Sequence, residues 1–118
     1  LDEYLNRYFI KVCREYLSLL NIHGQLSIQA VKSGLWIGKK GNIDIIVQDS
    51  MRRNIVAICN WSEPELDIGM WDHLEFAMKQ AKIKAEQYYL FSAHSFDEAV
   101  RQRAEEDAGI KLIDMKEL

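Results

Sequence analysis

The chain has 118 residues, which suits one domain, and 48% of them are hydrophobic, which is enough to form a core. The formal net charge of −3 counts mildly against DNA binding, because dedicated nucleic-acid binders are more often basic, and it leaves a local basic patch open. Cys13 and Cys59 lack the spacing of a metal or redox motif and predict buried thiols in a reducing cytosol. No apolar run is long enough to span a bilayer, and no P-loop is present. We therefore expect a cytoplasmic domain that does not itself bind ATP through a P-loop and has no membrane partner.

The first element predicted from the sequence is a helix over residues 1–20. Apolar residues recur there at steps of three and four, which is typical of a helix with one buried face. We expect the aromatic residues of this stripe to pack in the core. Gly24 is expected to end the helix. The apolar stripe consists of Leu1, Tyr4, Leu5, Tyr8, Phe9, Val12, Cys13, Tyr16, Leu17 and Leu20.

A group of strands is predicted next. Residues 25–31 alternate between polar and apolar types, which predicts a half-exposed strand, and residues 35–37 predict a turn or a short strand. Residues 42–47 and 54–61 are β-branched apolar runs around a polar turn, which predicts a β-hairpin with largely buried strands. Asp44 lies inside the first run, where an unpaired carboxylate is costly to bury. It is therefore either paired structurally or part of a site.

Helices and strands alternate in the rest of the chain. Residues 68–85 predict a helix with Asp67 as its N-cap, and residues 87–92 predict a strand. Ser95 and Glu98 form a predicted capping box for a helix that reaches about residue 108, followed by a last strand over residues 110–115. The order α-β-β-β-α-β-α-β predicts an α/β fold with a central mixed β-sheet flanked by helices on both faces.

The predicted hairpin resembles the core of the PD-(D/E)XK, or restriction-endonuclease-like, superfamily. In detail it is similar to the nuclease-like C-terminal domain of a family of prokaryotic P-loop ATPases. The pattern there is roughly Glu-Ile-Asp-Ile-Val-Ala, a turn, and Gly-Glu-Cys-Lys-Trp. Asp44, Cys59 and Trp61 match it, and the first helix is similar from Phe9 to Leu17. The resemblance implies a restriction-endonuclease-like fold for the whole chain.

The residues that would carry the nuclease chemistry are mostly replaced. Asn42 occupies the place of the first acid, Ile58 that of the Glu in Glu-x-Lys, and Asn60 that of its Lys. Such nucleases need a divalent metal held by carboxylates and a Lys that stabilises negative charge. The resemblance thus implies a vestigial site of Asp44, Asn42, Ile58 and Asn60, with Asp44 as its metal ligand. We expect no catalysis and no resident cofactor, and Mg²⁺ or Mn²⁺ only if the site is active; otherwise backbone donors or Asn60 hold Asp44.

The resemblance implies one nuclease-like domain, residues 1–118, from the C-terminal part of a longer ATPase whose ATP binds to a separate domain. Three functions stay open. The first is a catalytically inactive DNA- or protein-binding module that assists assembly of the ATPase. The second is an active metal-dependent DNA nuclease with a rearranged site, completed by an acid such as Glu63 or Glu65. The third is a dimerisation module without nucleic acid, so the partner is DNA, another protein or a second copy.

Overall fold

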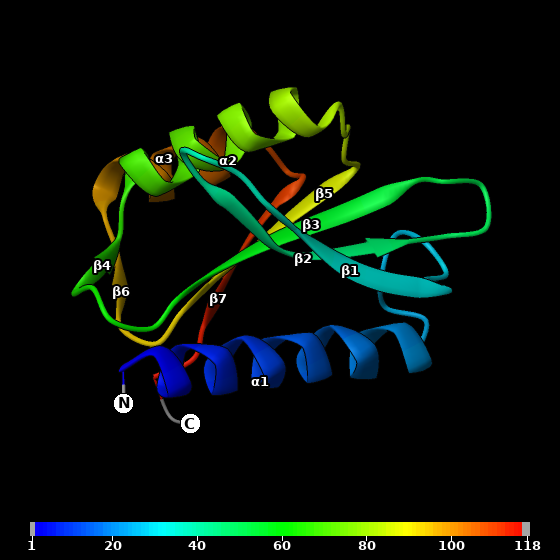
Figure 1. The fold of residues 1–118 in the computed structure, drawn as a ribbon, viewed down its shortest axis with the longest axis horizontal. Helices are drawn as coiled ribbons and strands as arrows, with labels where there is room; N and C mark the ends of the chain where they lie inside the picture. Colours follow the sequence, from blue (N-terminus) through cyan, green and yellow to red (C-terminus); the bar gives the residue numbers. More distant parts are fainter. Residues whose placement is uncertain (1, 117–118) are drawn as a thin grey trace.

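A five-stranded mixed sheet separates two helical layers in residues 2–116, the part of the chain that the computed structural model describes (Figure 1). The strands lie in the order β1-β2-β3-β5-β7. The pairs β1–β2 and β2–β3 are antiparallel, whereas β3–β5 and β5–β7 are parallel. The predicted mixed α/β fold is therefore confirmed. The strands are β1 (Lys32–Ile37), β2 (Asn42–Gln48), β3 (Asn54–Asn60), β5 (Gln87–Ser92) and β7 (Ile110–Asp114).

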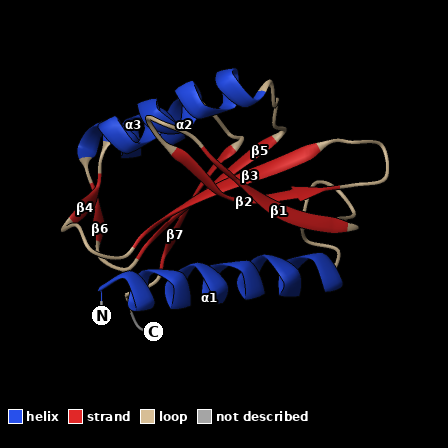
Figure 2. Ribbon diagram, viewed as in Figure 1, coloured by secondary structure: helices blue, strands red, loops and turns tan. Residues whose placement is uncertain are grey.

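Helices cover both faces of this sheet, as predicted. Helix α1 (Asp2–Ile22) lies on one face, and α2 (Ile68–Ala81) and α3 (Glu98–Glu106) lie on the other (Figure 2). Each face has its own apolar core because the central strands β3 and β5 are buried on both sides. Two short strands, β4 (Glu65–Leu66) and β6 (Ser95–Phe96), form a separate parallel pair that the predicted order lacks. No helix of residues 2–116 has the length and apolar content needed to cross a membrane.

The first helix is confirmed from Asp2 to Ile22, and Leu1 lies outside the described residues. It buries Phe9, Cys13 and Leu17 against the sheet. Tyr4 and Tyr8 are 62% and 57% exposed, so the prediction that they lie in the core is wrong. The sheet meets only one side of the helix, and the apolar stripe is wider than that side.

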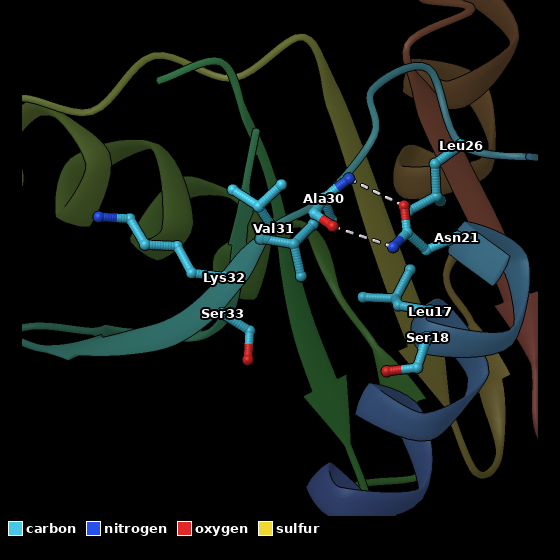
Figure 3. Close-up of a pocket in the computed structure, with 9 residues that line it drawn as sticks. Leu17, Ser18, Asn21, Leu26, Ala30, Val31, Lys32 and Ser33 are labelled. Atoms are coloured by element: carbon cyan, nitrogen blue, oxygen red, sulfur yellow. Dashed lines mark hydrogen bonds between the residues drawn. The ribbon is translucent and has the colours of Figure 1, made fainter. Parts of the chain in front are cut away.

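The strand predicted over residues 25–31 is absent, and this segment is a loop between α1 and β1. Asn21, at the end of α1, holds the loop: its Nδ2 donates to the carbonyl of Ala30 at 3.1 Å, and its Oδ1 accepts from the N–H of Ala30 at 2.8 Å (Figure 3). A cavity of about 190 Å³ lies beside this contact and is lined by Leu17, Leu26 and Val31, among others. The alternation of polar and apolar residues over 25–31 did not predict this loop. At Ala30, hydrogen bonds with the Asn21 side chain stand in place of the backbone bonds of a strand.

Asn21→Ala is expected to lower the free energy of unfolding by about 1–3 kcal/mol, because the N–H and C=O of Ala30 lose their partners. Urea unfolding of the variant and of the wild-type chain measures this difference. Asn6→Ala, a change of the same type on the same helix, is the control. An equal, small effect of both changes would show that the loop does not depend on Asn21.

The helices of the C-terminal half begin at aspartates. Asp67 caps α2 as predicted by accepting from the N–H of Met70. The helix ends at Ala81, not near residue 85, because Lys82 adopts a left-handed conformation (φ 57°). The predicted capping box is wrong: Asp97 caps α3, and Ser95 lies in β6. Asp97 accepts from Val100 N–H at 2.8 Å and from Ile68 N–H at 3.1 Å, so one carboxylate holds the first turns of both helices.

Candidate functional site

The candidate site lies where β2 and β3 separate. The predicted hairpin is confirmed, and its ladder extends from the turn to the pair Ile45 and Ala57. Beyond that pair, β2 continues beside β1 and β3 continues beside β5. Asp44 is the first residue of β2 past the end of the ladder. Its side chain therefore lies between two diverging strands.

One hydrogen bond holds the Asp44 carboxylate. The backbone N–H of Cys59 donates to Oδ2 at 2.8 Å, which agrees with the expectation of a backbone donor. Asn60, the other expected partner, bonds elsewhere. Burial raises the pKa of Asp44 to about 6, although the bond from Cys59 lowers it. The carboxylate is thus half-buried without a cation paired to it within the described residues.

Asn60 is buried and its amide is fully engaged. Nδ2 donates to the carbonyl of Glu63 at 2.9 Å and to Oγ of Ser92 at 3.1 Å. Oδ1 accepts from the N–H of Glu63 at 3.1 Å. Ile58 is 8% exposed and packs in the core beneath α2. At the two positions that the resemblance aligns with Glu-x-Lys, the side chains therefore serve the fold.

The other acids of the hairpin turn and of the segment after β3, including the expected replacements Glu63 and Glu65, do not join Asp44 in a site. Asp49 closes the β2–β3 turn, where its carboxylate accepts from Met51 N–H, Arg53 N–H and Arg53 Nε. Glu63 and Glu65 are exposed and line a different groove from the one beside Asp44. No group of three or more His, Cys, Asp or Glu side chains within residues 2–116 is arranged to hold a metal ion. The described residues therefore offer Asp44 as an isolated ligand.

Two grooves meet at Asp44 and Asn42. The smaller, of about 190 Å³, lies between the diverging strands and α2, with Met70 and His73 on its far side. The larger, of about 610 Å³, lies between α1 and the β1–β2 hairpin, and we call it the α1 groove. The α1 groove is lined by Glu3, Asn6, Arg7, Ile10, Lys11, Arg14, Leu35, Trp36, Ile37, Asn42, Ile43 and Asp44.

The α1 groove has a basic wall. Arg7, Lys11 and Arg14 follow one another at steps of four and three, so they share one side of α1. Glu3 and Asp44 are the acids among the lining residues. Nε of Arg14 is buried without a hydrogen-bond partner in the described structure. The sequence analysis missed this wall, although the helical spacing of the three cations was visible in the sequence.

The two cysteines are free, as predicted, and they meet between α1 and β3. Cys13 is buried and Cys59 is half-buried. Burial, followed by the hydrogen bond with Cys13, raises the pKa of the Cys59 thiol well above its usual value. A thiol that holds its proton is a weak nucleophile. The pair therefore packs α1 on the sheet and is no candidate for nucleophilic chemistry.

Comparisons with known proteins show a similar fold and the family of the chain. The chain is similar in structure to the protein of unknown function AF1548, with a TM-score of 0.55 and 16% sequence identity. The match covers 94% of this chain and 58% of that one, and at this identity it concerns the fold alone. No curated protein matches the sequence. Residues 1–82 match the family model DUF234, described as "Archaea bacterial proteins of unknown function", and the chain belongs to that family.

Proposed function

We propose that this chain is a restriction-endonuclease-like domain that binds nucleic acid in the α1 groove without cleaving it, as part of a longer P-loop ATPase. The observation that carries the proposal is the basic wall of a groove that Asp44 also lines. The resemblance of the hairpin and the first helix supports the superfamily and the ATPase. The residues around Asp44 and along the α1 groove support nucleic-acid binding without cleavage.

The size and charge of the α1 groove suit a phosphate backbone. Three cations along one helix side offer charge-assisted hydrogen bonds at intervals of one helical turn. Phosphate contacts of this kind supply most of the affinity in binding that is independent of sequence. The net charge of −3 also means that the surface outside this groove is acidic on balance. Nucleic acid would therefore be confined to the α1 groove.

The absence of cleavage follows from the ligands that surround Asp44. Metal-assisted hydrolysis needs a divalent ion held by converging oxygen ligands. Ile58 offers none, and the amide of Asn60 is committed to Glu63 and Ser92. Removing one charge-stabilising group from such a site costs about 10²–10³ in rate. A lone carboxylate would leave hydrolysis too slow to be useful.

Binding of a fluorescent duplex of about 20 base pairs, followed by anisotropy, tests the proposal. Replacing Arg7 and Arg14 together, as Arg7→Glu/Arg14→Gln, is expected to weaken binding about tenfold or more and to reduce its salt dependence. The matched control is Arg103→Glu/Lys111→Gln, which makes the same charge changes on exposed residues outside the groove. Equal losses in both variants, or no binding by the wild-type chain, would refute a nucleic-acid site in this groove.

Cleavage is scored in the same samples with plasmid and single-stranded DNA in the presence of Mg²⁺ or Mn²⁺. We expect none. Cleavage that disappears in Asp44→Ala would support an active nuclease instead. Its site would then be completed by a residue other than Asp49, Glu63 or Glu65.

A further inference from the structure

The side of α1 that points away from the sheet carries a stripe of exposed residues. Of these residues, only Lys11 takes part in the proposed function. Tyr4, Tyr8, Leu19 and Ile22 are 62%, 57%, 57% and 74% exposed, which is unusual for four large apolar side chains on one helix. Figure 1 shows α1 along one side of the molecule, and no other helix or strand of residues 2–116 covers its outer side in that view. This surface is therefore available to a partner.

The spacing of the stripe is that of a helix-pairing seam. Counting from Tyr4, the seam positions follow at alternating steps of four and three residues. This is the heptad spacing that keeps side chains on the line of contact between two helices. All of them lie within α1, and each is exposed. The outer seam consists of Tyr4, Tyr8, Lys11, Glu15, Ser18 and Ile22, with Leu19 beside Ser18.

The seam is complementary to itself in the antiparallel direction. If two copies of α1 cross at the level of Cys13, residues equally far before and after that position lie opposite each other. Lys11 then faces Glu15 of the second copy, and the same pair recurs across the two-fold axis. Tyr4 faces Ile22, an apolar residue, at both ends of the contact. A parallel pairing would instead place like charges together at these positions, which is unfavourable.

We propose that the outer seam of α1 is the interface of a two-fold symmetric, antiparallel dimer of this chain. The apolar ends of the seam supply the burial, and the central Lys11–Glu15 pairs fix direction and register. Lys11 also lines the α1 groove, so dimerisation would withdraw this one cation from the groove and leave Arg7 and Arg14 to contact phosphate. The seam lies on the exposed side of the helix, so pairing requires no rearrangement of the core residues Phe9, Cys13 and Leu17.

A charge swap tests the seam by sedimentation equilibrium over concentrations up to about 1 mM. Glu15→Lys places Lys11 and the new lysine opposite each other in both contacts, and it is expected to raise the dimer Kd about tenfold. Lys11→Glu/Glu15→Lys restores opposite charges and is expected to recover the wild-type Kd. Tyr8→Glu is expected to leave only monomer, with an unchanged circular dichroism spectrum because the side chain is exposed. A wild-type chain that stays monomeric, or a dimer insensitive to the swap, would overturn the proposal and leave the seam to another partner.

Disulfide trapping tests the register independently. Tyr8 and Ser18 lie opposite each other across the proposed axis, so Tyr8→Cys/Ser18→Cys is expected to give a covalent dimer under mild oxidation. Within one chain these positions are about 15 Å apart along the helix, too far for a bond. Tyr8→Cys and Ser18→Cys alone are the controls. In the proposed dimer, each cysteine lies about 15 Å along the helix axis from the same cysteine of the second copy, too far for a bond. Equal trapping in the single and double variants would exclude this register.

Discussion

Asp44→Asn is expected to unfold with a higher free energy than the wild-type chain at about pH 7.5, by about 3 kcal/mol. Burial raises the pKa of Asp44 from 3.8 to about 6, and the hydrogen bond from the Cys59 N–H offsets only part of this effect. At neutral pH the folded chain therefore holds a carboxylate in charged form at a cost. The amide of asparagine has the same shape, can accept from the same N–H and carries no charge.

The pH dependence follows from the direction of the shift. Because the pKa is higher in the folded state than in the unfolded state, the stabilising contribution of Asp44 is complete below pH 3.8 and is lost as the pH rises through about 6. The advantage of Asp44→Asn should therefore be small near pH 4 and grow until about pH 7. Urea unfolding of both proteins across this range measures the difference. If the difference in unfolding free energy between the two proteins stayed constant across this range, the Asp44 carboxylate would not titrate with a raised pKa.

Asp49→Asn is the matched control, since Asp49 is the other acid of this hairpin with little exposure. Its carboxylate is paired with Arg53 at 2.7 Å and accepts two backbone N–H bonds. Loss of the ion pair is expected to make this variant less stable than the wild-type chain at neutral pH, whereas Asp44→Asn is expected to be more stable. If Mn²⁺ stabilises the wild-type chain but not Asp44→Asn, Asp44 binds metal, and the site deserves reassessment as a nuclease.

Introducing the motif that the resemblance implies, as Ile58→Glu/Asn60→Lys, is expected to destabilise the chain by more than about 3 kcal/mol and to yield no nuclease. Asn60 is buried, and its amide satisfies the N–H and C=O of Glu63 and a hydrogen bond with Ser92. A lysine at this position loses the acceptor and carries a charge into a buried site. A glutamate at position 58 enters the apolar core beneath α2, where an ionised carboxylate is costly.

Urea unfolding and a plasmid-cleavage assay with Mg²⁺ measure both outcomes. Asn42→Glu, which introduces the other acid that the resemblance implies at an exposed position, is the control and should change stability by less than about 0.5 kcal/mol. If the double variant proved as stable as the wild-type chain and cleaved DNA, the hydrogen bonds of Asn60 would be dispensable. The surroundings of positions 58 and 60 would then be compatible with a working nuclease.

Sequence patterning was sufficient for the elements that bury a regular apolar face. The β2–β3 hairpin, the start of α2, strand β5 and both layers of helices follow from local periodicity and caps. It was insufficient where a side-chain hydrogen bond to the backbone replaces the structure that the local pattern predicts. Asn21 turns residues 25–31 into a loop through its bonds to Ala30, and Asp97 displaces Ser95 as the cap by also serving Ile68.

The sequence by itself determined which groups the candidate site lacks, because Ile58 and Asn60 cannot supply a carboxylate or an ammonium group. It also contained the helical spacing of Arg7, Lys11 and Arg14. Only the tertiary structure decided that these cations and Asp44 line one groove, because α1 and β2 are brought together by packing rather than by local sequence. It also decided that Tyr4 and Tyr8 face outward. A wide apolar stripe does not specify which of its sides the sheet will cover, and that choice depends on long-range contacts.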